Sequence, residues 1–283
     1  MEKKMNRVLV SIIIRTCQRP YILKRALESI VIQSYPEIQV VIVEDGNNES
    51  EKFIKENFSM LNICYVATGK KVGRAKAGNI GLELSEGVFL NFLDDDDMLF
   101  ENHVQTLVET LKKVKNRAAY SIAEERRLKI SNTTPNDYKI KGKSIRFKQP
   151  YNRMLLYTFN YIPIQSIMFH RSLYEQLGGF DEHLDALEDW DLWVRYSTKT
   201  DFCFVEKTTS CYHVPYEKKL KKRRAENLSE YRDAIYENFS NYEISLNIRD
   251  INKEMTYVIR EYKNNGIIRY IRMFFRALFF GER

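Results

Sequence analysis

Four consecutive aspartates, Asp94 to Asp97, stand directly behind the apolar run "FLNFL" at 89–93. A short apolar run of this kind is typical of a buried strand. Repulsion between neighbouring carboxylates and their desolvation both oppose such a cluster, so we expect a positive partner to neutralise it. Carboxylate oxygens are ligands for divalent cations such as Mg²⁺ and Mn²⁺. The sequence therefore predicts a divalent-cation site, although a solvated acidic turn that caps the following helix is the ordinary alternative.

The spacing within this cluster separates two pairs of aspartates. Alternate residues beyond a strand can point the same way, so Asp94 and Asp96 would reach one ligand together. Asp95 and Asp97 would then shape the turn or support the ligands. Four carboxylates exceed what helix capping needs, which favours the metal interpretation.

A second acidic group, Glu188, Asp189 and Asp191, opens an amphipathic segment with Trp190 and Trp193 alongside. Acidic residues are common in the first turn of a helix, where they meet its positive end. A positioned carboxylate can also act as a general base. The tryptophans are expected to be mostly core, although one of them could line a sugar pocket.

Alternating strands and helices must position these groups. Apolar, β-branched runs predict strands over 7–14, 38–45, 61–67 and 88–93, and helices are expected from Pro20 onward and over 73–87. Such βα units form mostly parallel sheets with helices on both faces. Ligands of these sheets bind beyond the carboxyl ends of the strands, where Arg15, Thr16, Asp45 and the four aspartates all fall.

The segment that follows, over 124–150, is polar and rich in turn residues, which favours a flap or β-insertion over a domain linker. Strand-like and helix-like patterns then resume, with the Gly178-Gly179 turn between them. No internal repeat is evident.

Composition excludes little but sets limits. The chain has 283 residues, of which 44% are hydrophobic, and a net charge of +7. That mild excess suits phosphate-bearing ligands or anionic lipid surfaces and does not predict a nucleic-acid partner. Four cysteines without a paired spacing are expected to be reduced. With no signal-peptide pattern and no membrane-spanning stretch, we expect a cytoplasmic protein that could lie at the inner face of the membrane.

Four segments together resemble the family-2 glycosyltransferases: "VSIIIRTCQRP", "VVIVEDGN", "GRAKAGNIGL" with "GVFLNFLDDDD", and "GGFDEHLDALEDWDLWVR". The resemblance covers roughly residues 7 to 215, and its strength lies in the joint match. It implies the GT-A fold, a Rossmann-like α/β architecture with a mostly parallel central sheet flanked by helices and, here, a C-terminal helical extension. We expect a catalytic domain over 1–215, with a nucleotide-binding half at 1–97 and an acceptor-binding half at 98–215, and a basic extension over 216–283.

The resemblance also implies an activity, the transfer of a sugar from a nucleotide diphosphate donor to an acceptor hydroxyl with inversion. A UDP-sugar donor and a role in cell-surface glycan or polysaccharide synthesis are expected. The cation, Mn²⁺ or Mg²⁺, would bridge the diphosphate and act as a Lewis acid. By resemblance Asp96 is the direct metal ligand, Asp94 lies nearer the ribose while sharing the metal, and His213 completes the metal shell; a purely structural role for this lone histidine is the alternative. An imidazole ligand favours Mn²⁺.

The same resemblance assigns the remaining site residues. Asp45 would accept from the uracil imide, since a carboxylate can only accept, and Thr16 would contact the same base. The family's usual Asp-Asp-Gly-Ser is Glu44-Asp45-Gly46-Asn47 here, and the alternative for Asp45 is a plain Asp-Gly turn. Asp189 is expected to be the general base, with Glu188 supporting it. The wider nucleotide-sugar site is predicted to contain Arg15, Asp95, Arg74, Lys76 and Asn79. A solvated helix face is the alternative for the last three.

Two other functions fit parts of the sequence. A metal-dependent nucleotidyltransferase would share the acidic strand ends, but it should carry a Gly-rich phosphate loop, and "RTCQRP" contains no glycine. A non-catalytic carbohydrate-binding or scaffold protein is the other alternative, against which the presence of both Asp96 and Asp189 speaks. An NAD(P) enzyme is disfavoured because no G-x-G-x-x-G follows a strand.

The C-terminal stretch over 267–281 has arginines on one helical arc and apolar residues opposite. This pattern suits a helix in a membrane interface, assisted by the basic run over 218–224, or a terminal helix packed on protein. The membrane interpretation predicts a lipid-linked glycan acceptor at the cytosolic face.

Overall fold

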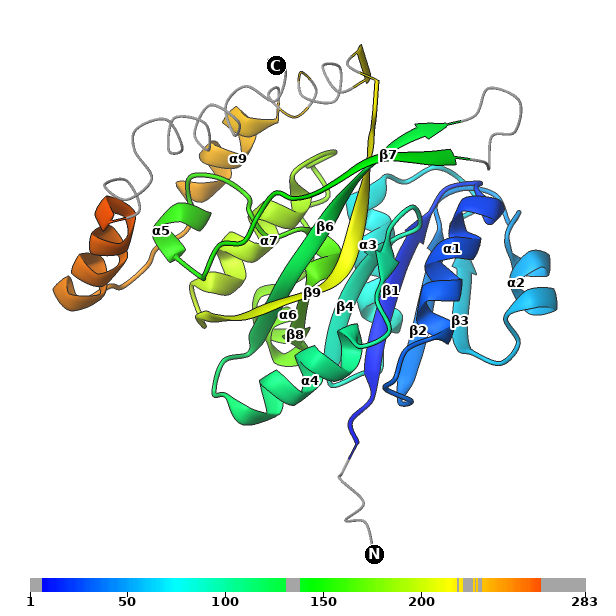
Figure 1. Cartoon of the computed structure of the whole chain (residues 1–283), viewed down its shortest axis with the longest axis horizontal. Coiled ribbons are helices and arrows are strands. Elements are labelled where there is room, and N and C mark those ends of the chain that lie inside the picture. Colours follow the sequence, from blue (N-terminus) through cyan, green and yellow to red (C-terminus); the bar gives the residue numbers. More distant parts are fainter. Residues whose placement is uncertain are drawn as a thin grey trace, which may run out of the picture.

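The computed structural model describes residues 7–130, 138–217 and 231–260, together with 219, 220, 226 and 228. A nine-stranded sheet runs through the molecule in the order β3-β2-β1-β4-β8-β6-β9-β5, with β7 paired to β6. Helices cover both of its faces (Figure 1). The α/β fold expected from the sequence is therefore confirmed.

The first half of the chain consists of βα units. Its elements are β1 (Val10–Thr16), α1 (Pro20–Val31), β2 (Ile38–Glu44), α2 (Glu51–Asn57), β3 (Asn62–Ala67), α3 (Arg74–Leu84) and β4 (Phe89–Asp94). These strands pair in parallel, β1 with both β2 and β4 and β2 with β3.

The apolar runs of β1, β2 and β4 are continuous because both faces of these strands are buried, whereas the edge strand β3 is partly exposed. Along β1, Ile13 packs in one hydrophobic cluster with side chains of α3 and α7. Its neighbours Ile12 and Ile14 pack in the other cluster, with side chains of α1, α2 and α4 (His103–Lys113). The two cores lie on opposite faces of one sheet and hold it in place from both sides.

The second half of the chain mixes strand directions. Its elements after β4 are β5 (Met98–Leu99), α4, β6 (Ala118–Ile130), β7 (Tyr138–Ile145), α5 (Arg153–Leu156), the 3₁₀ turn η1 (Ile164–Ser166), β8 (Ile167–His170), α6 (Arg171–Leu177), α7 (Glu188–Ser197) and β9 (Phe202–Pro215). Strands β5, β7 and β8 run against their neighbours, whereas β6 and β9 run with β1 and β4. The sheet as described is thus mostly parallel, and the polar segment expected to be a flap or β-insertion contains most of the β6–β7 hairpin.

Two glycines let α3 lie close to the sheet. A Cβ atom on Gly81 would stand 2.3 Å from Cγ2 of Ile13 on β1, and one on Gly78 would stand 2.5 Å from the ring of Phe180. Both positions are therefore filled by neighbouring side chains. This close approach sets the position of α3 beside the strand ends.

The described C-terminal residues include α9 (Arg232–Phe239) and a helix from 248 to 260. Within the described part of the chain, no helix is both long and apolar enough to cross a membrane. The predicted amphipathic stretch over 267–281 lies outside the described residues. All four cysteines are free, as expected.

Candidate active site

The predicted site residues from the first strands lie at one edge of the sheet. Arg15 and Asp94 are direct partners in the parallel register of β1 and β4, and Thr16 is the partner of Glu44 on β2. The parallel strands thus bring residues from three sequence segments to a common carboxyl edge.

Arg15 joins the two acidic groups that the sequence presents far apart. Its guanidinium donates to Oδ1 of Asp94 at 2.7 and 3.1 Å and to Oε1 of Glu188 at 2.7 Å. The Arg15 side chain is only 7% exposed and lies over the rings of Phe92 and Phe180. A charge buried this deeply needs such partners. Arg15 therefore fixes the end of β4 relative to the start of α7.

These contacts keep the pair ionised. Burial disfavours the charged form of Asp94, but the positive charges of Arg15, Arg74 and Arg19 and the hydrogen bonds from Arg15 outweigh it and lower the pKa of the carboxyl. Burial acts against the Arg15 cation too, and the charges of Asp94 and Glu188 raise its pKa above the ordinary value. At neutral pH Arg15 and Asp94 are therefore both charged.

The other three aspartates of the run have different surroundings. Asp95 is buried and accepts hydrogen bonds from the Thr16 hydroxyl at 2.7 Å and from Arg19 at 2.5 Å. Burial raises the pKa of Asp95 to about 7, against the opposing charge of Arg19. Asp97 is buried and accepts from the backbone N–H of His213 at 3.0 Å. Asp96 is exposed, so of the four it presents its carboxylate most openly to a ligand.

His213 lies beside this run, on β9. Its Nδ1 is hydrogen-bonded to the backbone carbonyl oxygen of Asp96, so Nδ1 carries the proton. Nε2 then holds a lone pair, and it is buried with no hydrogen-bond partner among the residues that the structure describes. Burial lowers the pKa of His213 and keeps the ring neutral. A neutral imidazole held through Nδ1 with a free Nε2 is the usual form of a metal-ligating histidine.

Asp96 and His213 fit a divalent cation that shares its coordination with a substrate. Among the described residues, no group of three or more His, Cys, Asp or Glu side chains is arranged to hold a metal ion. Mg²⁺-type sites in nucleotide-dependent enzymes commonly use one or two carboxylates plus substrate phosphates. An exposed carboxylate and a partnerless Nε2 on neighbouring elements meet that requirement.

Asp45 holds the loop before α3 in place through hydrogen bonds. Its carboxylate accepts from the backbone N–H groups of Val72 at 2.6 Å and Gly73 at 3.1 Å. Each carboxylate oxygen can accept a second hydrogen bond, so capacity for a ligand remains. The neighbouring Glu44 is buried and accepts from Ser50 and Tyr65, which holds the loop after β2. Glu44 was not among the predicted site residues.

The three residues predicted from the start of α3 have different roles in the structure. Asn79 exchanges hydrogen bonds with the backbone of Phe180 at 2.7 and 3.0 Å, so it connects α3 to the turn before α7. Lys76 is exposed and lies 3.4 Å from Glu182. Arg74 is exposed at the first residue of α3, and its charge acts on Asp94. Of the three, Arg74 is the best placed for a ligand near Asp94.

Asp189 stands in the first turn of α7. Its Oδ2 accepts from the amide of Asn160 at 2.9 Å, and its Oδ1 accepts from the backbone N–H of Trp190. Burial and the adjacent charge of Glu188 raise the pKa of Asp189 to about 7, against the effects of Asn160 and Arg15. A carboxylate with a pKa near neutrality is suited to general-base catalysis. Sequence reasoning missed Asn160 because it lies in an irregular segment with no motif of its own.

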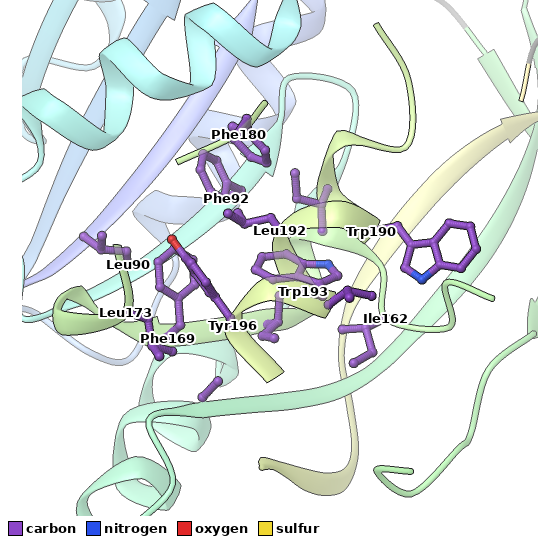
Figure 2. Close-up of a cluster of buried hydrophobic side chains, with 14 of the residues drawn as sticks. Leu90, Phe92, Ile162, Phe169, Leu173, Phe180, Trp190, Leu192, Trp193 and Tyr196 are labelled. Carbon is purple, nitrogen blue, oxygen red and sulfur yellow. The ribbon is translucent and has the colours of Figure 1, made fainter. Parts of the chain in front are cut away.

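The rest of the α7 motif belongs to the core. Figure 2 shows Trp190 and Trp193 in the buried cluster, where Trp193 packs on Phe169 and Tyr196. Trp190 donates from its ring to the carbonyl of Leu156 at 2.6 Å. Asp191 is fully buried and is paired with Arg195 at 2.8 Å. The side chains that follow Asp189 thus anchor the helix that carries it.

Two residues with a left-handed backbone flank the site. Leu187, with φ 61°, directly precedes Glu188, and Gln18, with φ 54°, lies in the loop after β1. Non-glycine residues adopt this conformation at a cost and only where their surroundings enforce it. The two strained residues thus lie in the loop that follows Arg15 on β1 and in the loop that precedes Glu188 on α7.

Comparison with solved structures supports the same fold. The crystal structure of Staphylococcus aureus TarS matches 91% of this chain and 45% of its own, with a TM-score of 0.65 and 16% identity. Mannosyltransferase PcManGT from Pyrobaculum calidifontis matches 83% of this chain and 68% of its own, with a TM-score of 0.58 and 17% identity.

Curated relatives are distant and longer than the matched region. An uncharacterized glycosyltransferase of Rickettsia prowazekii is 25% identical over 201 residues, covering 69% of this chain and 61% of its own length. The uncharacterized glycosyltransferase YwdF of Bacillus subtilis is 28% identical over 189 residues, covering 66% of this chain and 67% of its own.

The family model for glycosyl transferase family 2 matches residues 11–178, which is more than half of the chain. The matched region contains β1 with Arg15, the end of β2 with Asp45 and the four aspartates after β4. With this match and a GT-A architecture like that of the solved neighbours, the chain belongs to glycosyl transferase family 2.

Proposed function

We propose that this chain transfers a sugar from a nucleotide diphosphate donor, with a UDP-sugar favoured, to an acceptor hydroxyl with inversion. The observation that carries the proposal is the Arg15 bridge between Asp94 and Glu188. It brings the strand-end aspartates, suited to the donor, next to the first turn of α7, suited to the acceptor. A transferase needs these two chemistries side by side.

Asp189 is the proposed base. As the bond to the anomeric carbon forms, the acceptor hydroxyl must lose its proton, and the Asp189 carboxylate would take it. Its raised pKa, about 7, matches this task, and Asn160 orients the carboxylate. Glu188 is a weaker candidate because its carboxylate is buried and paired with Arg15. Its proposed role is to hold Arg15 and, through its charge, to raise the pKa of Asp189.

Asp96 and His213 are the proposed protein ligands of a divalent cation, with Asp94 at its edge. When bound, the cation would stabilise the charge that develops on the leaving diphosphate. Arg74 could add positive charge from the start of α3, a helix N-terminus suited to phosphate. Mn²⁺ is favoured over Mg²⁺ because an imidazole nitrogen is a better ligand for the former.

The donor class is supported by what is bound in the structural neighbours. TarS is known in complex with UDP and with UDP-GlcNAc, and PcManGT in complex with GDP-Man and Mn²⁺. A carboxylate acceptor such as Asp45 suits the imide N–H of uracil, which thymine shares. The acceptor is proposed to be a glycan or lipid-linked glycan of cell-surface synthesis.

The test is calorimetric binding of UDP, dTDP and GDP with and without Mn²⁺, together with donor hydrolysis. We expect Mn²⁺-dependent UDP binding that Asp96→Asn weakens at least about tenfold, because a carboxylate ligand is lost. Asp250→Asn removes an exposed carboxylate from the C-terminal helix and serves as the matched control.

Failure to bind any of these nucleotides under either condition would contradict the proposal and favour a scaffold protein of the same family. Release of pyrophosphate from UTP and a sugar phosphate would instead support a nucleotidyltransferase.

A further inference from the structure

An apolar ridge runs along the outer face of the C-terminal helix. Four large side chains of this helix are exposed: Ile248 at 78%, Ile251 at 39%, Met255 at 41% and Ile259 at 49%. Their spacing of three, four and four residues places them within an arc of about 80° on a helix. Single exposed apolar residues are ordinary, but four in one row mark a surface that something covers.

Another side of this helix is already used. Glu254 accepts from the backbone N–H of Arg153 at 3.0 Å, and its carbonyl accepts from Asn152 at 3.1 Å. Tyr257 and Val258 pack against the main hydrophobic core. The helix is therefore attached to the acceptor half of the molecule through a side centred about 110° around the helix from the ridge.

Basic side chains lie on a third side of the helix. Arg249, Lys253 and Arg260 are exposed and lie about 100–140° around the helix from Ile248. The acids of the helix are Asp250 and Glu254, of which Glu254 is turned toward the domain. An apolar stripe with cations on the polar face of the same helix is the pattern of a helix lying in a membrane interface.

We propose that this ridge, the side chains of Ile248, Ile251, Met255 and Ile259, binds the surface of a bilayer that contains anionic lipids. Anionic head groups attract the cations of the polar face, while the aliphatic side chains enter the region between head groups and acyl chains.

The position of the helix connects this surface to the transfer reaction. Figure 1 shows the helix, in orange and red, beside α5 and at the end of the molecule away from α2. Lipid contact there would leave the donor half facing the solvent. Resting on the proposed function, this orientation favours an acceptor carried by a lipid, which would reach the first turn of α7 from the membrane side.

The experiment is co-sedimentation of the full chain with vesicles of phosphatidylcholine alone and of phosphatidylcholine mixed with phosphatidylglycerol. We expect binding to the anionic vesicles that the double variant Ile248→Glu/Ile259→Glu weakens at least about tenfold, since two apolar anchors are lost. The matched control is Ile32→Glu/Met60→Glu, which changes residues of similar exposure, 56% and 67%, on the donor half. Arg249→Gln/Lys253→Gln/Arg260→Gln should reduce the preference for anionic over neutral vesicles.

Three results would overturn the proposal. These are absence of wild-type binding to anionic vesicles, equal binding by the ridge variant and the wild type, and a vesicle-free dimer seen by light scattering that the ridge variant loses. UDP binding measured on the same samples without vesicles shows whether the donor site is intact, so a failure of membrane binding can be told apart from a failure of the proposed function. All variants alter exposed side chains, so they are expected to fold like the wild type. UDP binding by each variant checks this.

Discussion

At the scale of single residues, the buried guanidinium of Arg15 holds the most consequential position. Arg15 pairs with two carboxylates that come from distant segments of the chain, and the side chains around it leave little access to water. Such a bridge adds little net stability relative to apolar packing, but removing one partner leaves buried charge uncompensated. Its value lies in fixing the aspartates after β4 relative to Asp189, the proposed base.

We therefore expect Arg15→Met to lower the free energy of unfolding by about 3–5 kcal/mol. Adding Glu188→Gln should recover part of this loss, because a neutral amide then replaces the more deeply buried of the two unpaired carboxylates. Urea denaturation of the two variants measures both effects. An unchanged unfolding midpoint for Arg15→Met would show that the bridge is not maintained in solution.

Asp189, the proposed base, gives a prediction about pH. Since the pKa of Asp189 is about 7, kcat/KM should fall as the pH drops below that value and the carboxylate becomes protonated. Asn160 donates to the carboxylate and favours its charged form, so Asn160→Ala should move the acidic limb of the profile to higher pH. Asp189→Asn should reduce kcat by about 10²–10⁴-fold.

The matched control for this profile is Asn116→Ala. Asn116 donates to the carbonyl of Asp201, outside the candidate site, so its loss should leave the pH profile in place. An acidic limb that persists unchanged in an active Asn160→Ala variant would assign that limb to another group.

At the scale of elements, the packing of α3 on β1 determines where Arg74 and Asn79 lie. In an exposed helix, Gly→Ala stabilises by about 1 kcal/mol. At Gly81 the new methyl group would overlap Ile13, and overpacking of this kind costs about 1–3 kcal/mol. We expect a net loss of stability for Gly81→Ala in urea denaturation, whereas Glu83→Ala, at an exposed position of the same helix, should stay within about 0.5 kcal/mol of wild type. A more stable Gly81→Ala variant would contradict the packing described.

How much could be predicted from sequence also differs between elements. Strands buried on both faces carry continuous apolar runs, so β1, β2 and β4 could be predicted from local pattern alone. The hydrogen-bond partners of the site residues could not be predicted in this way, because residues that are distant in the sequence come together only in the folded chain. Arg15 and Glu188 are 173 positions apart. Arg19, which holds Asp95, and Asn160, which holds Asp189, carry no periodic signal.

At the scale of the whole molecule, the described C-terminal residues cover part of α7. Trp190 packs edge-on against Tyr236 and Phe239 of α9. The hydroxyl of Tyr242 donates to the buried carboxylate of Asp191 at 2.8 Å. Contacts that support α7 therefore cross the predicted domain boundary at 215.

A chain ending at Pro215 tests whether this cover is needed. Without it, Trp190 would lose its contacts with Tyr236 and Phe239 and become solvent-exposed, and Asp191 would lose its hydrogen bond from Tyr242. We expect a red-shifted tryptophan emission and a lower unfolding midpoint in urea than for the full chain. The variant Trp190→Phe, made in both lengths, assigns the shift, since Trp193 lies deep in the core. If the short chain matches the full chain in midpoint and emission, residues 1–215 are a self-sufficient domain and the extension serves only contacts outside it.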